Sequence, residues 1–271
     1  MKQVLIVGAG HHSPTGPISF LHWMQGQAPV HAKGLFFRPM DYATLATDTR
    51  GASTIPVMEL EDNEIEVIAV HKALFSRQCG QYHIPYSLHD NDREWNKDLL
   101  QKESRFADLI LISGECFYAE TGNNSQYLRE VLYAAECPVL LVPENFTTVQ
   151  RMFMAYDGSR DSLYALKQFY YLFPASTDLP TEILYVNEGA GDTIPDLDRL
   201  KQFTRAKFDC ISFSRLHFNA RNYLATWISE KKNALLVSGS FGRSPVSYIG
   251  NRSFSEDVIH GHQLPVFIAH R

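Results

Sequence analysis

The chain has 271 residues, of which 45% are hydrophobic and 20% charged, and its formal net charge is −5. This size suits one large or two ordinary globular domains, and the scattered basic residues exclude a track for nucleic acid or an anionic membrane surface. No apolar run reaches about 18 residues, so we expect no membrane span. Because Met1 leads directly into a strand-like run, we expect a cytoplasmic protein. The cysteines form no CxxC pair, which argues against disulfide or zinc frameworks: Cys79, Cys116, Cys137 and Cys210.

Five apolar runs in the first half of the chain predict five strands. They cover residues 4–7, 32–37, 86–89, 107–112 and 139–142. Ile18, Leu21 and Met24 recur at helical spacing after the first run, and residues 127–135 have the length of a helix. Residues 41–63 are polar and irregular, and we expect an insertion or an extended loop there.

The second half repeats this order, with strand-like runs at 152–155, 181–186, 210–216, 234–237 and 266–269. A helix after the first run is predicted by the spacing of Leu163, Leu166, Phe169 and Tyr170. In both halves, 31 residues separate the start of the fourth strand from the proline that opens the fifth, from Ala107 to Pro138 and from Ala234 to Pro265.

Each half therefore predicts the order βαβαβαβαβ. This order is typical of α/β proteins with a doubly wound, mostly parallel, five-stranded sheet of Rossmann-like type. We expect two domains, residues 1–146 and 150–271, joined by a polar stretch.

A glycine-containing loop, Gly239-Ser240-Phe241-Gly242, comes directly after the fourth strand of the second half. Glycines there let backbone N–H groups approach an anion, and a helix that starts after the loop adds the positive end of its dipole. The loop is thus a candidate phosphate site. An ordinary βα turn that needs glycine for its dihedral angles is the alternative.

Several motifs resemble those of the universal stress protein family in its tandem-domain form. The run from Phe153 that ends in Asp157-Gly158-Ser159 resembles the opening strand of that family. The family's nucleotide motif, G-x2-G-x9-G-[ST], is matched by Gly239, Gly242 and Ser253, whereas Arg252 stands in place of the third glycine. Arg243 also suits the family, and residues 265–268 resemble its last strand.

The first half keeps the frame of this family and lacks its site. Gly8-Ala9-Gly10-His11-His12-Ser13 follows its first strand without an aspartate, and Gly114-Glu115-Cys116-Phe117 places Phe117 where the second glycine would stand. We interpret this half as a degenerate copy.

The resemblance implies a fold of the adenine nucleotide alpha hydrolase type and ATP or a related adenine nucleotide as ligand, with Mg²⁺ accompanying it. Asp157 would contact the adenosine, and the backbone at Tyr185-Val186 would meet the adenine edge. The glycines would admit ribose and phosphates, and Ser253 would bind phosphate oxygens. The implied nucleotide-binding set is Asp157, Gly158, Ser159, Val186, Gly239, Gly242, Arg243, Arg252 and Ser253.

Arg252 leaves three outcomes open. A positive φ at that position would strain an arginine, an ordinary φ would let the guanidinium bind phosphate, and a side chain turned into the pocket would block the ligand.

The function that the resemblance implies is a stress-response binding or signalling module, with the two halves packed as an intramolecular pseudo-dimer through their last strands. No cofactor or metal is required, and no residue set combines a catalytic acid, base or nucleophile with its partners. Two alternatives stay open: a scaffold that binds protein partners without nucleotide, and a nucleotide hydrolase that cleaves ATP slowly.

Four other patterns have simpler interpretations. The Gly8 loop lacks the third glycine of a dinucleotide fingerprint, and the histidines at 11–12, 260 and 262 lack ligand partners at suitable spacing. Ser159 is outside any GxSxG elbow and is expected to cap the following helix. Core or interface packing is expected for the aromatic set Phe169, Tyr170, Tyr171 and Phe173.

Overall fold

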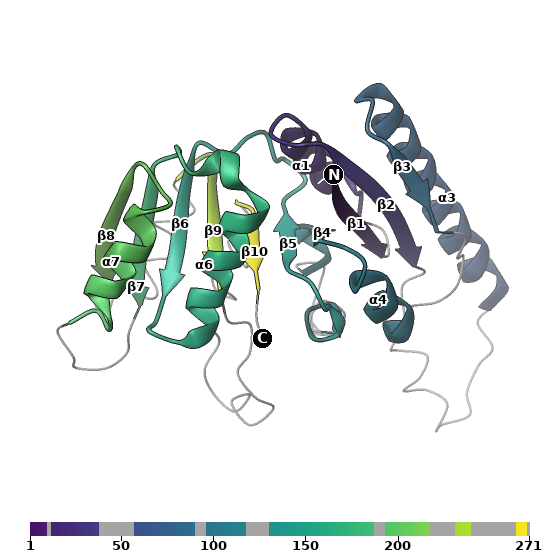
Figure 1. The fold of residues 1–271 in the computed structure, drawn as a ribbon. Coiled ribbons are helices and arrows are strands. Elements are labelled where there is room, and N and C mark those ends of the chain that lie inside the picture. Colours follow the sequence, from purple (N-terminus) through teal and green to yellow (C-terminus); the bar gives the residue numbers. More distant parts are fainter. Residues whose placement is uncertain are drawn as a thin grey trace, which may run out of the picture. The chain divides into compact units, whose positions relative to one another are not determined.

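The chain divides into two compact units, Met1–Glu136 and Cys137–Arg271, in the computed structural model shown in Figure 1. The structure describes residues 1–9, 12–37, 57–89, 96–117, 130–186, 193–216, 231–239 and 264–269. The domain ranges 1–146 and 150–271 stay a prediction, because compactness alone does not define an independently folding domain. Within the described residues, no helix combines the length and the apolar character that crossing a membrane requires.

The first unit is an α/β layer built on a parallel sheet with the strand order β3-β2-β1-β4. Residues 130–134 are also helical. The elements in chain order are β1 (Lys2–Ala9), α1 (Thr15–Gln25), β2 (Val30–Phe37), α3 (Val57–Gln81), β3 (Tyr86–Leu88), α4 (Lys97–Ser104), β4 (Leu109–Ser113) and the 3-10 helix η1 (Gly114–Phe117).

Helix α1 forms as the apolar spacing predicts, with Ile18, Leu21 and Met24 buried on its inner face. The prediction of an irregular segment at 41–63 is wrong for residues 57–63, because α3 already begins at Val57. Residues 57–63 are polar but include the strong helix formers Met58, Glu59 and Leu60, so their polarity alone does not predict a loop. Residues 41–56 lie outside the described residues.

The second unit has the strand order β5-β10-β9-β6-β7-β8. All neighbouring strands are parallel except β5 and β10, which pair antiparallel. The α/β class and the mostly parallel sheet are therefore confirmed. The elements are β5 (Val139–Val142), β6 (Arg151–Tyr156), α6 (Arg160–Leu172), the 3-10 helix η2 (Pro174–Ser176), β7 (Thr181–Val186), α7 (Leu197–Arg205), β8 (Ile211–Leu216), β9 (Ala234–Ser238) and β10 (Val266–Ile268).

Aromatic packing joins α6 to the sheet of the second unit. The ring of Phe169 lies 4.8 Å from that of Phe173 and 5.3 Å from that of Phe267, and all three side chains are buried. The expectation of core packing is thus confirmed for Phe169 and Phe173. It is wrong for Tyr171, which is 60% exposed because it lies on the opposite side of the helix end.

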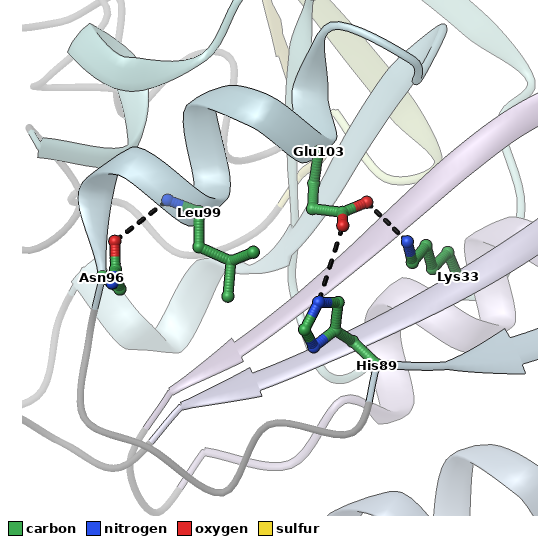
Figure 2. Close-up of polar contacts among 5 residues, drawn as sticks. All are labelled: Lys33, His89, Asn96, Leu99 and Glu103. Atoms are coloured by element: carbon green, nitrogen blue, oxygen red, sulfur yellow. Dashed lines mark hydrogen bonds and ion pairs between the residues drawn. The ribbon is translucent and has the colours of Figure 1, made fainter.

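Figure 2 shows how a single carboxylate fastens α4 to the sheet of the first unit. Glu103 accepts an ion-paired hydrogen bond from Lys33 Nζ of β2 at 2.6 Å, and its other oxygen lies 3.6 Å from His89 Nε2, just after β3. At the other end of α4, Asn96 Oδ1 accepts the backbone N–H of Leu99 at 2.9 Å and so caps the helix. The contacts of Glu103 tie α4 to β2 and to the residue that follows β3.

Loss of the Lys33–Glu103 pair should destabilise the protein more than loss of a fully exposed pair. In a double-mutant cycle with Lys33→Met and Glu103→Gln, urea unfolding should give a coupling free energy of about 1 kcal/mol, because the Glu103 side chain is only 18% exposed. The control is the 86% and 60% exposed pair of Arg199 and Asp196, where coupling should approach zero. Equal coupling in the two cycles would contradict this expectation.

Candidate functional site

The strand order of the second unit reverses between β6 and β9. β6 pairs with β7 on one side and with β9 on the other, in parallel and with Met154 opposite Val237. The chain therefore leaves these two neighbouring strands at the same edge of the sheet, after Tyr156 and Ser238. In open α/β sheets, ligands bind at the carboxyl ends of strands where the order reverses.

The loop after β6, Asp157-Gly158-Ser159, is held by its own hydrogen bonds. The backbone N–H of Ser159 donates to Asp157 Oδ1 at 2.9 Å, which closes a turn around Gly158. Gly158 has a φ of 82°, a left-handed conformation that glycine adopts without a steric cost. Ser159 Oγ then accepts the N–H of Ser162 at 3.2 Å, so the prediction that Ser159 caps α6 is confirmed.

The chain after β9 lies directly against the start of α6. A Cβ atom at Gly239 would come closer than 3.0 Å to the backbone carbonyl of Asp161 and to the backbone nitrogen of Ser162. Only a residue without a side chain fits there. The contact brings Gly239 beside the capped first turn of the helix that follows Asp157, as the shared sheet edge predicts.

A turn just before α7 also contacts the Asp157 loop, and sequence reasoning missed it. The hydroxyl of Tyr156 donates to the carbonyl oxygen of Pro195 at 3.2 Å, and a Cβ at Gly158 would lie 3.0 Å from Pro195 Cγ. The following residue, Asp196, has a left-handed φ of 49°. A proline and an aspartate directly before a helix are a helix-start signal that could have located this turn.

Two carboxylates, those of Asp157 and Asp196, act on Tyr156 in the described part of this site. The pKa of Tyr156 is raised, chiefly by burial of the phenol, and further by the negative charges of Asp196 and Asp157 and by Tyr185. Tyr156 therefore keeps its proton at neutral pH and remains a hydrogen-bond donor. Carboxylates at this position suit a ligand group that presents hydrogen-bond donors, such as a ribose hydroxyl or an exocyclic amine. Among the described residues, no group of three metal-ligating side chains occurs.

The predicted site residues are only partly covered by the structure. Asp157, Gly158, Ser159 and Gly239 meet at the carboxyl ends of β6 and β9. Val186 ends the neighbouring strand β7 and pairs with Leu216 of β8. Four predicted residues lie outside the described residues: Gly242, Arg243, Arg252 and Ser253.

The corresponding edge of the first unit has different chemistry. β1 and β4 are neighbours there, with Val7 opposite Ile112, and η1 follows β4 directly. Glu115 of η1 accepts a hydrogen bond from Ser113 Oγ at 2.8 Å, so a carboxylate stands where a phosphate site would need donors. A Cβ at Gly8 would collide with the ring of Phe36, so packing alone requires this glycine.

Comparisons with known proteins identify the fold. No family model matches the chain, and no curated protein matches its sequence. A universal stress protein from Archaeoglobus fulgidus DSM 4304 has a similar structure, with a TM-score of 0.68 at 16% identity over 98% of this chain and 96% of that one. A Pseudomonas aeruginosa UCBPP-PA14 protein assigned to the same group has a TM-score of 0.53 at 12% identity over 100% and 93%.

A protein of unknown function from Pseudomonas aeruginosa PAO1 is similar to the same degree, with a TM-score of 0.53 at 11% identity over 100% of this chain and 92% of that one. At these identities the likeness is one of fold. The chain thus has the fold of universal stress proteins, which confirms the fold that the resemblance implies.

The close contact of Gly239 with α6 predicts that a side chain at this position destabilises the protein. Gly239→Ala should lower the free energy of unfolding by about 2 to 3 kcal/mol, because the new methyl group would push β9 away from α6. The matched control is Gly80→Ala in α3, where a Cβ meets nothing within 4 Å and should stabilise the helix by about 0.5 to 1 kcal/mol. Chemical denaturation compares the two. A Gly239→Ala protein as stable as the wild type would contradict the described contact.

Proposed function

We propose that the second unit binds an adenine nucleotide, ATP or a close relative, within a protein that acts as a stress-response binding or signalling module. The observation that supports this most is the meeting of the Asp157 loop with Gly239 where the strand order reverses. Two of the loops that carry the resemblance to the nucleotide motif share one edge of the sheet. Loops at that edge are where α/β proteins place nucleotides.

In this proposal the two ends of the ligand meet different residues. The exposed Asp157 accepts hydrogen bonds from the adenosine, and the backbone at Val186 lies along the adenine edge. Ser159 acts by holding the loop, since its N–H and its hydroxyl already bond within the turn. Gly239, Gly242, Arg243, Arg252 and Ser253 would surround ribose and phosphates, with Mg²⁺ accompanying the phosphates.

The location and assembly expected from the sequence belong to the same proposal. β5 and β10 are the closing strands of the two sequence repeats, and they pair antiparallel. The intramolecular pseudo-dimer of the two halves stays part of the proposal and rests on the sequence repeat. The proposed location is the cytoplasm.

A scaffold without nucleotide is the second candidate function, and a specific observation favours it. The backbone of Asp161 and Ser162 already explains why position 239 must be glycine. The glycine on which the phosphate interpretation relies is therefore required by packing whether or not a ligand binds. Binding itself must decide between the two functions.

A thermal-shift titration tests the proposal. ATP, ADP and AMP, each with Mg²⁺, should raise the melting temperature by several degrees, since a ligand at about a hundred times its Kd adds about 2.7 kcal/mol. Asp157→Asn should abolish the shift for all three, because it keeps an oxygen that can accept the Ser159 N–H but removes the charge. The control Glu115→Gln, in the first unit, should leave the shift unchanged.

The same titration separates the alternatives. If none of the three nucleotides moves the melting curve, the nucleotide proposal is wrong and the scaffold is favoured. If inorganic phosphate is released from ATP above background, and Asp157→Asn stops the release, the hydrolase is favoured instead.

A further inference from the structure

Three aromatic rings on the surface of the second unit lie within 6 Å of the ammonium group of one lysine. Lys207 lies in the turn after α7, where its backbone N–H bonds to the carbonyl of Thr204. Its Nζ lies 4.0 Å from the ring centroid of Tyr170, 5.3 Å from that of Phe203 and 5.9 Å from that of Tyr171. We call Tyr170, Tyr171 and Phe203 the aromatic cluster.

The aromatic cluster comes from two helices. Tyr170 and Tyr171 lie near the end of α6, with ring planes at 63° and centroids 5.7 Å apart, and Phe203 lies on α7. A cation is attracted to the negative face of a ring when it lies within about 6 Å of the centroid. All three rings satisfy this distance for one ammonium group. Several aromatic faces near one cation are the kind of contact by which aromatic cages bind organic cations.

The aromatic cluster is also reachable from solvent. Tyr171 is 60% exposed, and Tyr170, Phe203 and Lys207 are each half-buried. Among the described residues no carboxylate pairs with Lys207, and the three rings are the described neighbours of its charge. A lysine ammonium is strongly hydrated, whereas methyl groups reduce hydration and add apolar contact with the rings. The rings therefore suit a methylated ammonium better than the lysine they now hold.

We propose that the aromatic cluster is a binding site for a methylated ammonium cation, and that Lys207 is an internal occupant which such a ligand displaces. The proposal is independent of nucleotide binding, because it involves none of the residues at the ends of β6 and β9. Lys207 reaches the rings through a flexible side chain on a surface turn, so it can leave without a change in the fold.

The chain offers a matched control for this proposal. Lys167 Nζ also lies over Phe203, at 5.8 Å, but it contacts only that ring of the cluster. Lys167→Ala and Lys207→Ala remove the same charge from the same region. Only Lys207→Ala empties the centre of the aromatic cluster.

Titration with tetramethylammonium chloride at constant ionic strength, followed by NMR of the aromatic protons, measures the affinity of the full-length protein. An internal occupant held by exposed cation–π contacts should weaken binding about three- to sixfold, so Lys207→Ala should bind tetramethylammonium tighter than Lys167→Ala by that factor. Tyr170→Leu, in the Lys207→Ala background, should remove binding. Near-UV circular dichroism verifies that each variant is folded.

Two results would overturn the proposal. One is equal affinity in the Lys207→Ala and Lys167→Ala proteins, and the other is binding that survives Tyr170→Leu.

A second pair of ligands distinguishes the source of the cation. If a trimethyllysine peptide binds tighter than both tetramethylammonium and the unmethylated peptide, the natural ligand is a methylated protein side chain. If the trimethyllysine peptide binds only as tightly as tetramethylammonium, the natural ligand is a small solute.

Discussion

The second unit depends on one close contact, that of Gly239 with the first turn of α6. The backbone at the end of β9 touches the backbone of Asp161 and Ser162, and no side chain fits between them. This contact joins the end of one central strand to the helix that follows its neighbour. The Asp157 loop is built on the same turn, because Ser159 both closes the loop and caps α6. Packing, capping and the candidate site therefore share a few backbone atoms.

This arrangement gives the two halves different chemistry on one frame. Both units place two neighbouring parallel strands where the order reverses, β1 with β4 and β6 with β9. In both units a glycine directly follows the fourth strand, Gly114 and Gly239, but the next residue is the carboxylate Glu115 in the first unit and Ser240 in the second. The same arrangement of core strands can thus keep its fold while the residues at the strand ends differ between the two copies.

The sequence predicted the strands well because most are buried apolar runs with clear ends, and 181–186 coincides with β7. Contacts between residues that are far apart in the sequence could not be predicted in this way. The hydrogen bond of Tyr156 to Pro195 spans 39 positions, and no local pattern connects them. Polarity alone also misled at residues 57–63, where strong helix formers extend α3. Strand order was enough to predict where the candidate site lies, whereas the packing of Gly239 against α6 could be found only from the structure.

A crystal structure of the protein soaked with ATP and Mg²⁺ tests the central claim most directly. Nucleotide density at the carboxyl ends of β6 and β9, with the adenosine against Asp157 and the phosphates beyond Gly239, is the expected result, and it would show where Arg252 points. Clear density for the loops of the second unit with no nucleotide at saturating ATP, or with nucleotide only in the first unit, would contradict it.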